Sequence, residues 1–182
     1  METVLSRRLI ELFGWIDPGP GSTHLVSDIS GWWRDPDVLA RVGPALAGLF
    51  PEDRPTVVIA PEVTGLLLGP LVAVAAGAGF LPAYKDGGER RRVGPTRWAQ
   101  TPPDYRGRQL RVGVDGRRLN PGDRVLLVDD WVDTGAQLDA LGRVVRDAGA
   151  DLIGAAALVA TCPPEVGERL GLRALVTGDE LP

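Results

Sequence analysis

The chain has 182 residues, of which 44% are hydrophobic, and its formal net charge is −4 at pH 7. This length suits one domain with a sizeable core. The single cysteine, Cys162, excludes an intramolecular disulfide framework and a cysteine-based zinc site, and the single histidine, His24, excludes a histidine cluster around a metal. We therefore expect a reduced, cytoplasmic protein.

The first third of the chain carries helix and strand patterns. Residues 1–14 alternate charged and apolar side chains as an amphipathic helix does, which does not fit a secretory signal. Apolar residues recur at helical spacing over residues 35–49, and residues 56–60 form a short β-branched run. We expect a helix and then a strand at these two places.

Residues 63–84 contain no charged side chain across a length that would cross a bilayer. Glycine and proline interrupt this stretch repeatedly, however. A helix over residues 65–76, a glycine turn and a buried strand over residues 80–84 explain it better than a membrane span does. We expect no membrane partner.

A basic stretch follows, from Lys85 to Arg108. It holds seven basic and three acidic residues, so the rest of the chain carries a net charge of −8. Such a stretch suits either a nucleic-acid patch or a mobile lid that closes over a pyrophosphate. The acidic remainder favours the lid, and we expect no nucleic-acid partner. The segment 86–108 lacks a hydrophobic period and is predicted to be a long, flexible loop or hairpin.

The most informative motif joins a buried strand to a phosphate-binding turn. Residues 125–128 suit a strand covered on both faces, and Asp129 and Asp130 are placed at its carboxyl end. Residues 133–137 then open an amphipathic helix, so free backbone N–H groups and the helix dipole meet at one point. A purely structural interpretation is a strand, a turn and a helix that is capped by Asp133 or Thr134. It explains the turn but leaves the paired acids unexplained.

The second half continues the alternation of strands and helices. Strand patterns cover residues 109–114, 152–160 and 172–176, and helical patterns cover 134–148 and 164–170. Strands separated by helices imply parallel βαβ units that bind ligands at the carboxyl ends of the strands. The predicted fold class is α/β, a Rossmann-like and mainly parallel sheet flanked by helices.

The stretch from Arg124 to Gln137 resembles the phosphoribosyl pyrophosphate motif of type I phosphoribosyltransferases, and it matches all but the last position, where Gln137 replaces Ser or Thr. Three further segments, residues 24–39, 80–85 and 119–124, look like parts of adenine phosphoribosyltransferases. Together the resemblance covers most of residues 10–160. It implies one phosphoribosyltransferase domain over residues 1–182, with a hood-like segment at 1–34 and a catalytic lid at 86–108.

The resemblance also assigns site residues. Ribose and 5′-phosphate binding fall to the motif residues Asp129, Asp130, Asp133, Thr134, Gly135, Ala136 and Gln137. The pyrophosphate loop and the lid contribute Glu62, Val63, Thr64, Gly65, Lys85 and Arg106. Base binding falls to Val26, Ser27 and Trp131, and the catalytic residues are Asp133, Asp104 and Tyr105. Trp131 has two interpretations, stacking on the base or filling the core beneath the motif.

This chain departs from the adenine enzymes at three places. The pyrophosphate loop carries Thr64 where the family has Arg. The adenine enzymes usually carry Ala at the position of Asp133, whereas hypoxanthine-guanine enzymes carry an Asp that moves the proton of the base nitrogen. Asp104-Tyr105 replaces a Glu-Tyr pair, so the acid is about one methylene shorter.

The sequence therefore predicts a pentosyltransferase that moves ribose 5-phosphate from phosphoribosyl pyrophosphate to a purine or purine-like base and releases pyrophosphate, as in nucleotide salvage. Mg²⁺ is the expected cofactor, carried by the substrate and held with help from Asp129 and Asp130. The resemblance suggests a homodimer. The alternative is a non-catalytic regulator that senses phosphoribosyl pyrophosphate, which the missing loop Arg and Gln137 favour and the acid-base residues disfavour.

Overall fold

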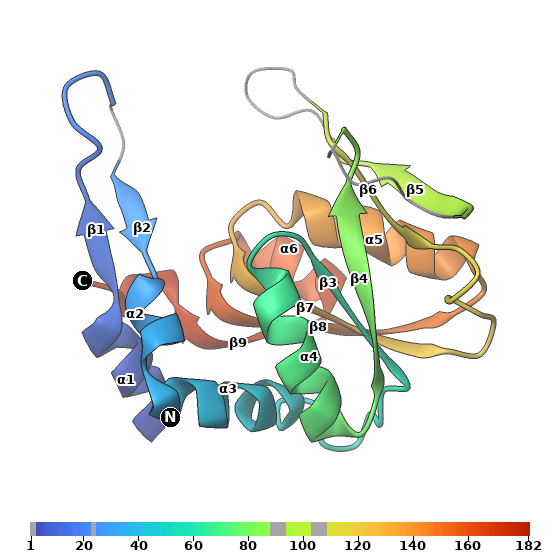
Figure 1. The fold of residues 1–182 in the computed structure, drawn as a ribbon, viewed down its shortest axis with the longest axis horizontal. Coiled ribbons are helices and arrows are strands. Elements are labelled where there is room, and N and C mark those ends of the chain that lie inside the picture. The colour runs from blue at the N-terminus through green and yellow to red at the C-terminus, as the bar shows by residue number, and fades with distance from the viewer. Residues whose placement is uncertain (1–2, 23–24, 88–93, 103–108) are drawn as a thin grey trace.

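The computed structural model describes residues 3–22, 25–87, 94–102 and 109–182. A twisted sheet forms the body of the molecule, with strands in the order β5-β6-β4-β3-β7-β8-β9 (Figure 1). Its strands are β3 (Val57–Pro61), β4 (Gly79–Lys85), β5 (Thr96–Gln100), β6 (Arg111–Asp115), β7 (Arg124–Val132), β8 (Asp151–Ala160) and β9 (Leu172–Thr177). Five neighbouring strands, from β4 to β9, run parallel, and β6 runs antiparallel to both β4 and β5. The expected α/β class is confirmed.

Helices cover both faces of the sheet. They are α1 (Val4–Leu12), α2 (Ser30–Arg34), α3 (Pro36–Ala47), α4 (Gly65–Ala76), α5 (Ala136–Asp147) and α6 (Pro164–Leu170), with a 3₁₀ turn at Gly178–Glu180. Helices α1 to α4 share one apolar core with the sheet, and α5 and α6 share the other. Central strand β7 contributes Leu126 to the first core and Leu127 to the second, as expected for a strand covered on both faces.

The topology places a switch point between β3 and β7. The parallel strands follow the chain as β3, β4, β7, β8 and β9, but β4 lies on one side of β3 and β7 on the other. The connections that leave β3 and β7 therefore go to opposite faces of the sheet, through α4 and α5. Such a switch point leaves a crevice at the carboxyl ends of the strands.

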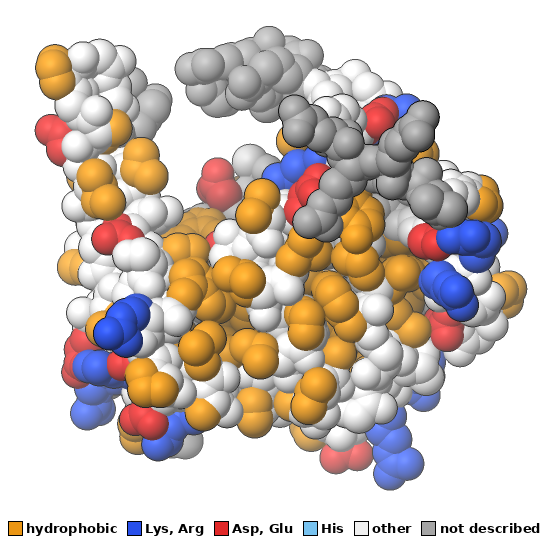
Figure 2. Space-filling model, viewed as in Figure 1, with side chains coloured by type: hydrophobic (Ala, Val, Ile, Leu, Met, Phe, Trp, Pro, Cys, Tyr) orange, Lys and Arg blue, Asp and Glu red, His pale blue; other side chains and the backbone are white. Residues whose placement is uncertain are grey.

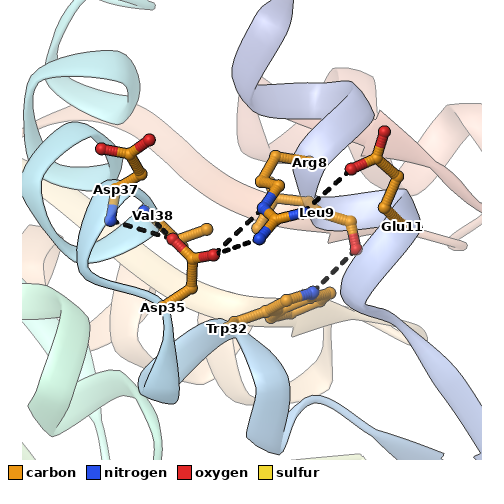
Figure 3. A network of polar contacts seen from close by, with 7 residues as sticks. All are labelled: Arg8, Leu9, Glu11, Trp32, Asp35, Asp37 and Val38. Atoms are coloured by element: carbon orange, nitrogen blue, oxygen red, sulfur yellow. Dashed lines mark hydrogen bonds and ion pairs between the residues drawn. The ribbon is translucent and has the colours of Figure 1, made fainter.

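The N-terminal segment docks through polar contacts onto α3 (Figure 3). Arg8 of α1 forms an ion pair with Asp35 at 2.7 Å, and the other oxygen of Asp35 accepts the N–H groups of Asp37 and Val38 at the start of α3. Trp32 of α2 is fully buried and donates its indole N–H to the carbonyl of Leu9 at 2.8 Å. From this base a hairpin of β1 (Gly14–Ile16) and β2 (Val26–Asp28) projects beside the body (Figure 1).

Most predicted elements are present, and the helices over 65–76 and 164–170 have the predicted bounds. Strand β7 is longer than predicted. It continues through both acids to Val132, because β8 runs alongside and pairs with it as far as Ala160. Helix α5 begins at Ala136, two residues later than predicted, since Gly135 adopts a left-handed conformation.

Residues 86–108 are predicted to be a flexible loop or hairpin, and residues 96–100 belong to an antiparallel strand pair, as the hairpin alternative requires. These residues form β5, which pairs with β6 along its whole length. The antiparallel ladder provides hydrogen-bond partners for backbone groups of β5. Trp98 lies opposite Gly113, whose missing side chain leaves room for the indole. Residues 88–93 and 103–108 of the predicted lid lie outside the described residues.

Among the described residues, no helix has both the length and the apolar character needed to cross a membrane.

Candidate active site

Three segments that the sequence predicts to bind phosphoribosyl pyrophosphate meet at the switch point. Residues 62–65 follow β3, Lys85 ends β4, and the motif occupies the end of β7 and the start of α5. Because β4, β3 and β7 are adjacent and parallel, their carboxyl ends lie at one edge of the sheet. The fold therefore gathers onto one rim residues that lie up to 75 positions apart in the sequence.

The paired acids differ in their surroundings. Asp129 is 7% exposed, whereas Asp130 is only partly buried. Burial raises the pKa of Asp129 well above its usual range, repulsion from Asp130 adds to this rise, and the charge of Lys85 opposes it. One carboxylate oxygen of Asp129 accepts the N–H of Asp130 at 3.0 Å. The site thus contains one carboxyl group whose ionisation is disfavoured, Asp129, beside a more accessible carboxylate, Asp130.

The turn after β7 leads directly into the start of a helix. Gly135 has φ of +68°, a conformation that costs residues with a side chain, and α5 starts directly after it. The Thr134 hydroxyl accepts the N–H of Ala136 at 3.4 Å. The remaining N–H groups in the first turn of a helix lack intrahelical partners and attract anions.

A cavity of about 230 Å³ opens over this turn. It is lined by Asp129, by Trp131 and by every residue from Val132 to Leu138. Inside the turn, the side-chain carbonyl oxygen of Gln137 is buried and has no hydrogen-bond partner among the described residues. A buried acceptor without a partner is energetically costly, and only a hydrogen-bond donor would remove this cost.

Trp131 packs against aromatic rings of the N-terminal segment. Its ring centroid lies 5.8 Å from that of Phe13 and 6.3 Å from that of Trp15, and the Trp15 contact is edge to face. The indole N–H of Trp131 donates to the hydroxyl of Thr161 at 3.0 Å. Trp131 is partly buried and also lines the cavity, so it has both an interior contact and a face toward the site.

Asp133 lies on the exposed side of the same cavity. One of its carboxylate oxygens is 3.4 Å from the hydroxyl of Thr161, which also lies 3.4 Å from the carbonyl of Val132. Asp133 does not cap α5; the cap position is Gly135. Its carboxylate therefore remains available to a ligand.

The loop after β3 is tied to the next strand by its acid. Glu62 accepts the backbone N–H of Lys85 at 2.6 Å, and its own N–H donates to the carbonyl of Ala83 at 2.9 Å. Val63 is 78% exposed, and α4 begins at Gly65, directly after Thr64. Glu62 thus fixes the loop against β4, and the backbone and hydroxyl of Thr64 lie where the family has Arg.

The two predicted base-binding residues of the hairpin face opposite ways. Ser27 pairs with Trp15 and Val26 pairs with Ile16. Cross-strand partners share a face of a sheet, so Ser27 lies on the face of Trp15, whose ring meets Trp131, and Val26 lies on the other face. The described cavity is lined by neither residue. Asp104, Tyr105 and Arg106 lie outside the described residues.

Sequence reasoning missed Trp15 and Thr161. Neither belongs to a motif, and each reaches the site only because β1 and the end of β8 lie beside β7 in space. For Trp15 the one available signal was a tryptophan in a segment that the resemblance places over the base. For Thr161 the signal was a hydroxyl residue directly after a buried strand, at the edge where ligands bind.

The described residues contain no group of three or more His, Cys, Asp or Glu side chains that would form a metal site by themselves. Asp129 and Asp130 offer two carboxylate ligands. Proteins commonly give one or two carboxylates to a Mg²⁺ ion carried by a phosphorylated substrate. These residues fit such an ion, provided that the substrate supplies the remaining oxygens.

No family model matches the chain. The adenine phosphoribosyltransferase of Myxococcus xanthus is 33% identical to it over 165 residues, which cover 88% of this chain and 83% of that protein. The xanthine phosphoribosyltransferase of Brevibacillus brevis is 32% identical over 128 residues, covering 69% and 63%. The crystal structure of adenine phosphoribosyltransferase from Rhodothermus marinus matches with a TM-score of 0.80 at 25% identity, over 95% of this chain and 98% of that one.

These relatives are transferases, so the comparisons give no support to a non-catalytic regulator. Sequence identity above 30% along most of both chains, together with the shared fold and the shared motif at the switch point, leads to one conclusion. The chain belongs to the adenine phosphoribosyltransferase family of type I phosphoribosyltransferases.

Proposed function

We propose that this protein transfers ribose 5-phosphate from phosphoribosyl pyrophosphate to a ring nitrogen of a purine and releases pyrophosphate. The observation that carries the proposal is the switch point, where the start of α5, two carboxylates and the loop after β3 lie at the same edge of the sheet. Each of the three suits a different part of the sugar substrate. The proposed unit is the whole chain, with residues 1–34 as a hood and residues 86–108 as a lid.

The 5′-phosphate would lie on the amides of residues 133–137, with the Thr134 hydroxyl and the Gln137 amide as further contacts. A phosphate oxygen at this point would accept hydrogen bonds from the free N–H groups at the start of α5, and the positive end of the helix dipole would favour its charge. The ribose hydroxyls would donate to Asp129 and Asp130. The pyrophosphate would then extend toward residues 62–65 and Lys85.

Mg²⁺ bound with the substrate would offset charge on the pyrophosphate, and Asp129 and Asp130 are the residues that would help to hold it. Lys85 places a further positive charge at this rim, and this charge opposes the rise in the pKa of Asp129. Thr64 contributes a hydroxyl and backbone N–H groups in place of the Arg that the family has.

In the transfer step, the bond between C1′ and the pyrophosphate oxygen breaks and the electron pair leaves with pyrophosphate. Positive charge develops on the ribose ring, and the carboxylates of Asp129 and Asp130 favour it. The base nitrogen forms the new bond to C1′, and its proton passes to Asp133. Asp104, Tyr105 and Arg106 keep the lid roles that the resemblance implies.

The base would lie between the cavity and the hairpin. The partly exposed ring of Trp131 and the Trp15 face of the hairpin offer aromatic surface for a planar heterocycle. Relatives named for adenine and for xanthine both occur, and Asp133 is an acid of the kind that 6-oxopurine enzymes use. We therefore include both aminopurines and oxopurines among the substrates to be tested.

We further propose that the protein is a homodimer that pairs through α4. This helix is apolar on all sides, and its outward face exposes Leu67, Pro70 and Val74 at spacings of three and four residues, with Val63 exposed in the loop just before it. Figure 2 shows hydrophobic side chains gathered over α4 in the middle of this face. Helices that are apolar all round are normally buried, and a second α4 would bury this one.

Steady-state release of pyrophosphate tests the proposal, with Mg²⁺, phosphoribosyl pyrophosphate and adenine, hypoxanthine, guanine or xanthine. We expect turnover with at least one purine. Asp133→Asn should then lower kcat by about 100-fold while leaving the KM for phosphoribosyl pyrophosphate nearly unchanged, because the lost group acts on the base proton.

Asp147→Asn, at the far end of α5, is the matched control and should behave as wild type. Tight binding of phosphoribosyl pyrophosphate without pyrophosphate release for any of the four bases would overturn the proposal. Wild-type kcat in Asp133→Asn, measured where chemistry limits the rate, would remove Asp133 from the mechanism.

A further inference from the structure

Thr161 lies between the two groups that the proposed function places around the base. It follows β8 directly, and its backbone N–H donates to the carbonyl of Val132 at 2.9 Å, which fixes it beside the end of β7. Its hydroxyl accepts the indole N–H of Trp131 at 3.0 Å and lies 3.4 Å from a carboxylate oxygen of Asp133. One hydroxyl thus meets a base-facing ring and a proton-accepting carboxylate.

The hydroxyl group suits this double contact chemically. Its oxygen lone pair accepts from Trp131, and its single hydrogen is then directed toward the carbonyl of Val132 and the carboxylate of Asp133. The first contact fixes the rotation of the indole, which has no other polar group. The second contact holds one carboxylate oxygen of Asp133, a residue that lines the cavity.

We propose that Thr161 is a positioning residue for the transfer reaction, one that holds the indole of Trp131 and the carboxylate of Asp133 in register with the bound purine. This inference rests on the proposed function, because it needs a base beside Trp131 and a proton that moves to Asp133. Thr161 itself touches neither reacting atom. It acts by restricting the freedom of two side chains that do.

Thr161→Val and Thr161→Ser separate the hydroxyl from the packing. Valine keeps the shape and the methyl contact with Gly178, whereas serine keeps the hydroxyl and loses that methyl. Thr161→Val should raise the KM for the purine about fivefold and lower kcat about fivefold, with the KM for phosphoribosyl pyrophosphate unchanged, because each effect follows the loss of about one hydrogen bond. Thr161→Ser should restore both parameters to nearly wild-type values.

Trp131→Phe tests the first contact from the other side, since phenylalanine keeps a ring but has no N–H. It should raise the KM for the purine, and combining it with Thr161→Val should add little further, because both changes break the same hydrogen bond. Thermal unfolding checks that each variant is folded. If Thr161→Val does not fold, the KM of Trp131→Phe for the purine tests the same hydrogen bond.

Wild-type kinetics in Thr161→Val would overturn the positioning role. Equal impairment of the valine and serine variants, with a raised KM for phosphoribosyl pyrophosphate, would also overturn it and assign Thr161 to packing. Asp133→Asn separates this failure from a failure of the proposed function. If that variant keeps its kcat, the role of Asp133 is wrong, whereas the coupling between Trp131 and Thr161 is still measured by the KM for the purine.

Discussion

At the scale of single residues, Asp129 has the most constrained charge in the site. It is 7% exposed and lies beside a second carboxylate. The folded state therefore binds a proton at Asp129 more tightly than the unfolded chain does. The contribution of Asp129 to folding stability is fully present below the ordinary pKa of 3.8 and is lost as the pH rises through the raised pKa of the folded state.

Asp129→Asn should abolish this loss, because an amide carries no charge to bury. We expect the free energy of unfolding of the variant, measured with urea at a series of pH values, to exceed that of the wild type by on the order of 1 kcal/mol or more at neutral pH. The difference should shrink as the pH approaches 4.

Asp130→Asn provides a graded comparison, since it removes the repulsion but leaves the burial. It should reduce the pH-dependent loss without abolishing it. Parallel pH profiles of wild type and Asp129→Asn would contradict the raised pKa of Asp129.

The identity of the motif residues was predictable from the sequence because the chemistry is local. Asp129, Asp130 and the turn at 133–137 are consecutive, so a linear pattern describes them fully. Contacts between distant segments were not predictable in this way. Thr161 meets Trp131 only through the register of β7 and β8, and no short motif encodes that register.

At the scale of elements, the start of α5 depends on one glycine. A side-chain carbon built at Gly135 would lie 2.5 Å from a methyl carbon of Val166 and 3.1 Å from one of Leu170, and the backbone there is left-handed. Helix α6 therefore packs directly on the turn before α5, and only glycine combines this contact with this conformation.

Gly135→Ala should lower the free energy of unfolding by about 2 kcal/mol, because an unfavourable φ adds to a steric clash. It should also weaken phosphoribosyl pyrophosphate binding at least tenfold as the turn shifts. Urea denaturation and calorimetric titration measure the two effects.

Gly167→Ala is the matched control, since a side chain at this position of α6 meets no atom within 4 Å. Alanine has the higher helix propensity, so this variant should be as stable as wild type or more stable by up to about 1 kcal/mol. Equal behaviour of the two glycine variants would contradict the special role of Gly135.

The observed strand bounds differ from the predicted ones where pairing with a neighbouring strand outweighs the local sequence pattern. The paired acids look like the end of a strand by composition, yet β8 extends the ladder past them. Residues 96–100 have no hydrophobic period, yet they pair fully with β6. In both cases a neighbouring strand supplies backbone hydrogen bonds that propensity does not anticipate.

At the scale of the whole molecule, the exposed face of α4 lies next to the pyrophosphate loop. Val63 is 78% exposed in this loop, two residues before α4 begins at Gly65. A partner that covers α4 would therefore also cover the outer side of this loop. Assembly and substrate binding would then stabilise the same few residues.

Leu67→Arg should convert the proposed dimer into a monomer, because it places a charge in the centre of an apolar interface. Sedimentation equilibrium at micromolar concentration measures the mass directly. Val4→Arg is the matched control, since Val4 is 75% exposed on α1 and lies away from α4. A monomeric wild type, or a dimeric Leu67→Arg variant, would contradict the proposed interface.

The position of the paired acids on β7 has a consequence for how ligand binding is detected. Strand β7 lies between β3 and β8, so its amides exchange with solvent only when the central sheet opens. A substrate held by Asp129 and Asp130 slows that opening by mass action on the whole fold. Hydrogen exchange in β7 would therefore report the total binding free energy, whereas exchange in the projecting β1–β2 hairpin would report only the local effect of the base.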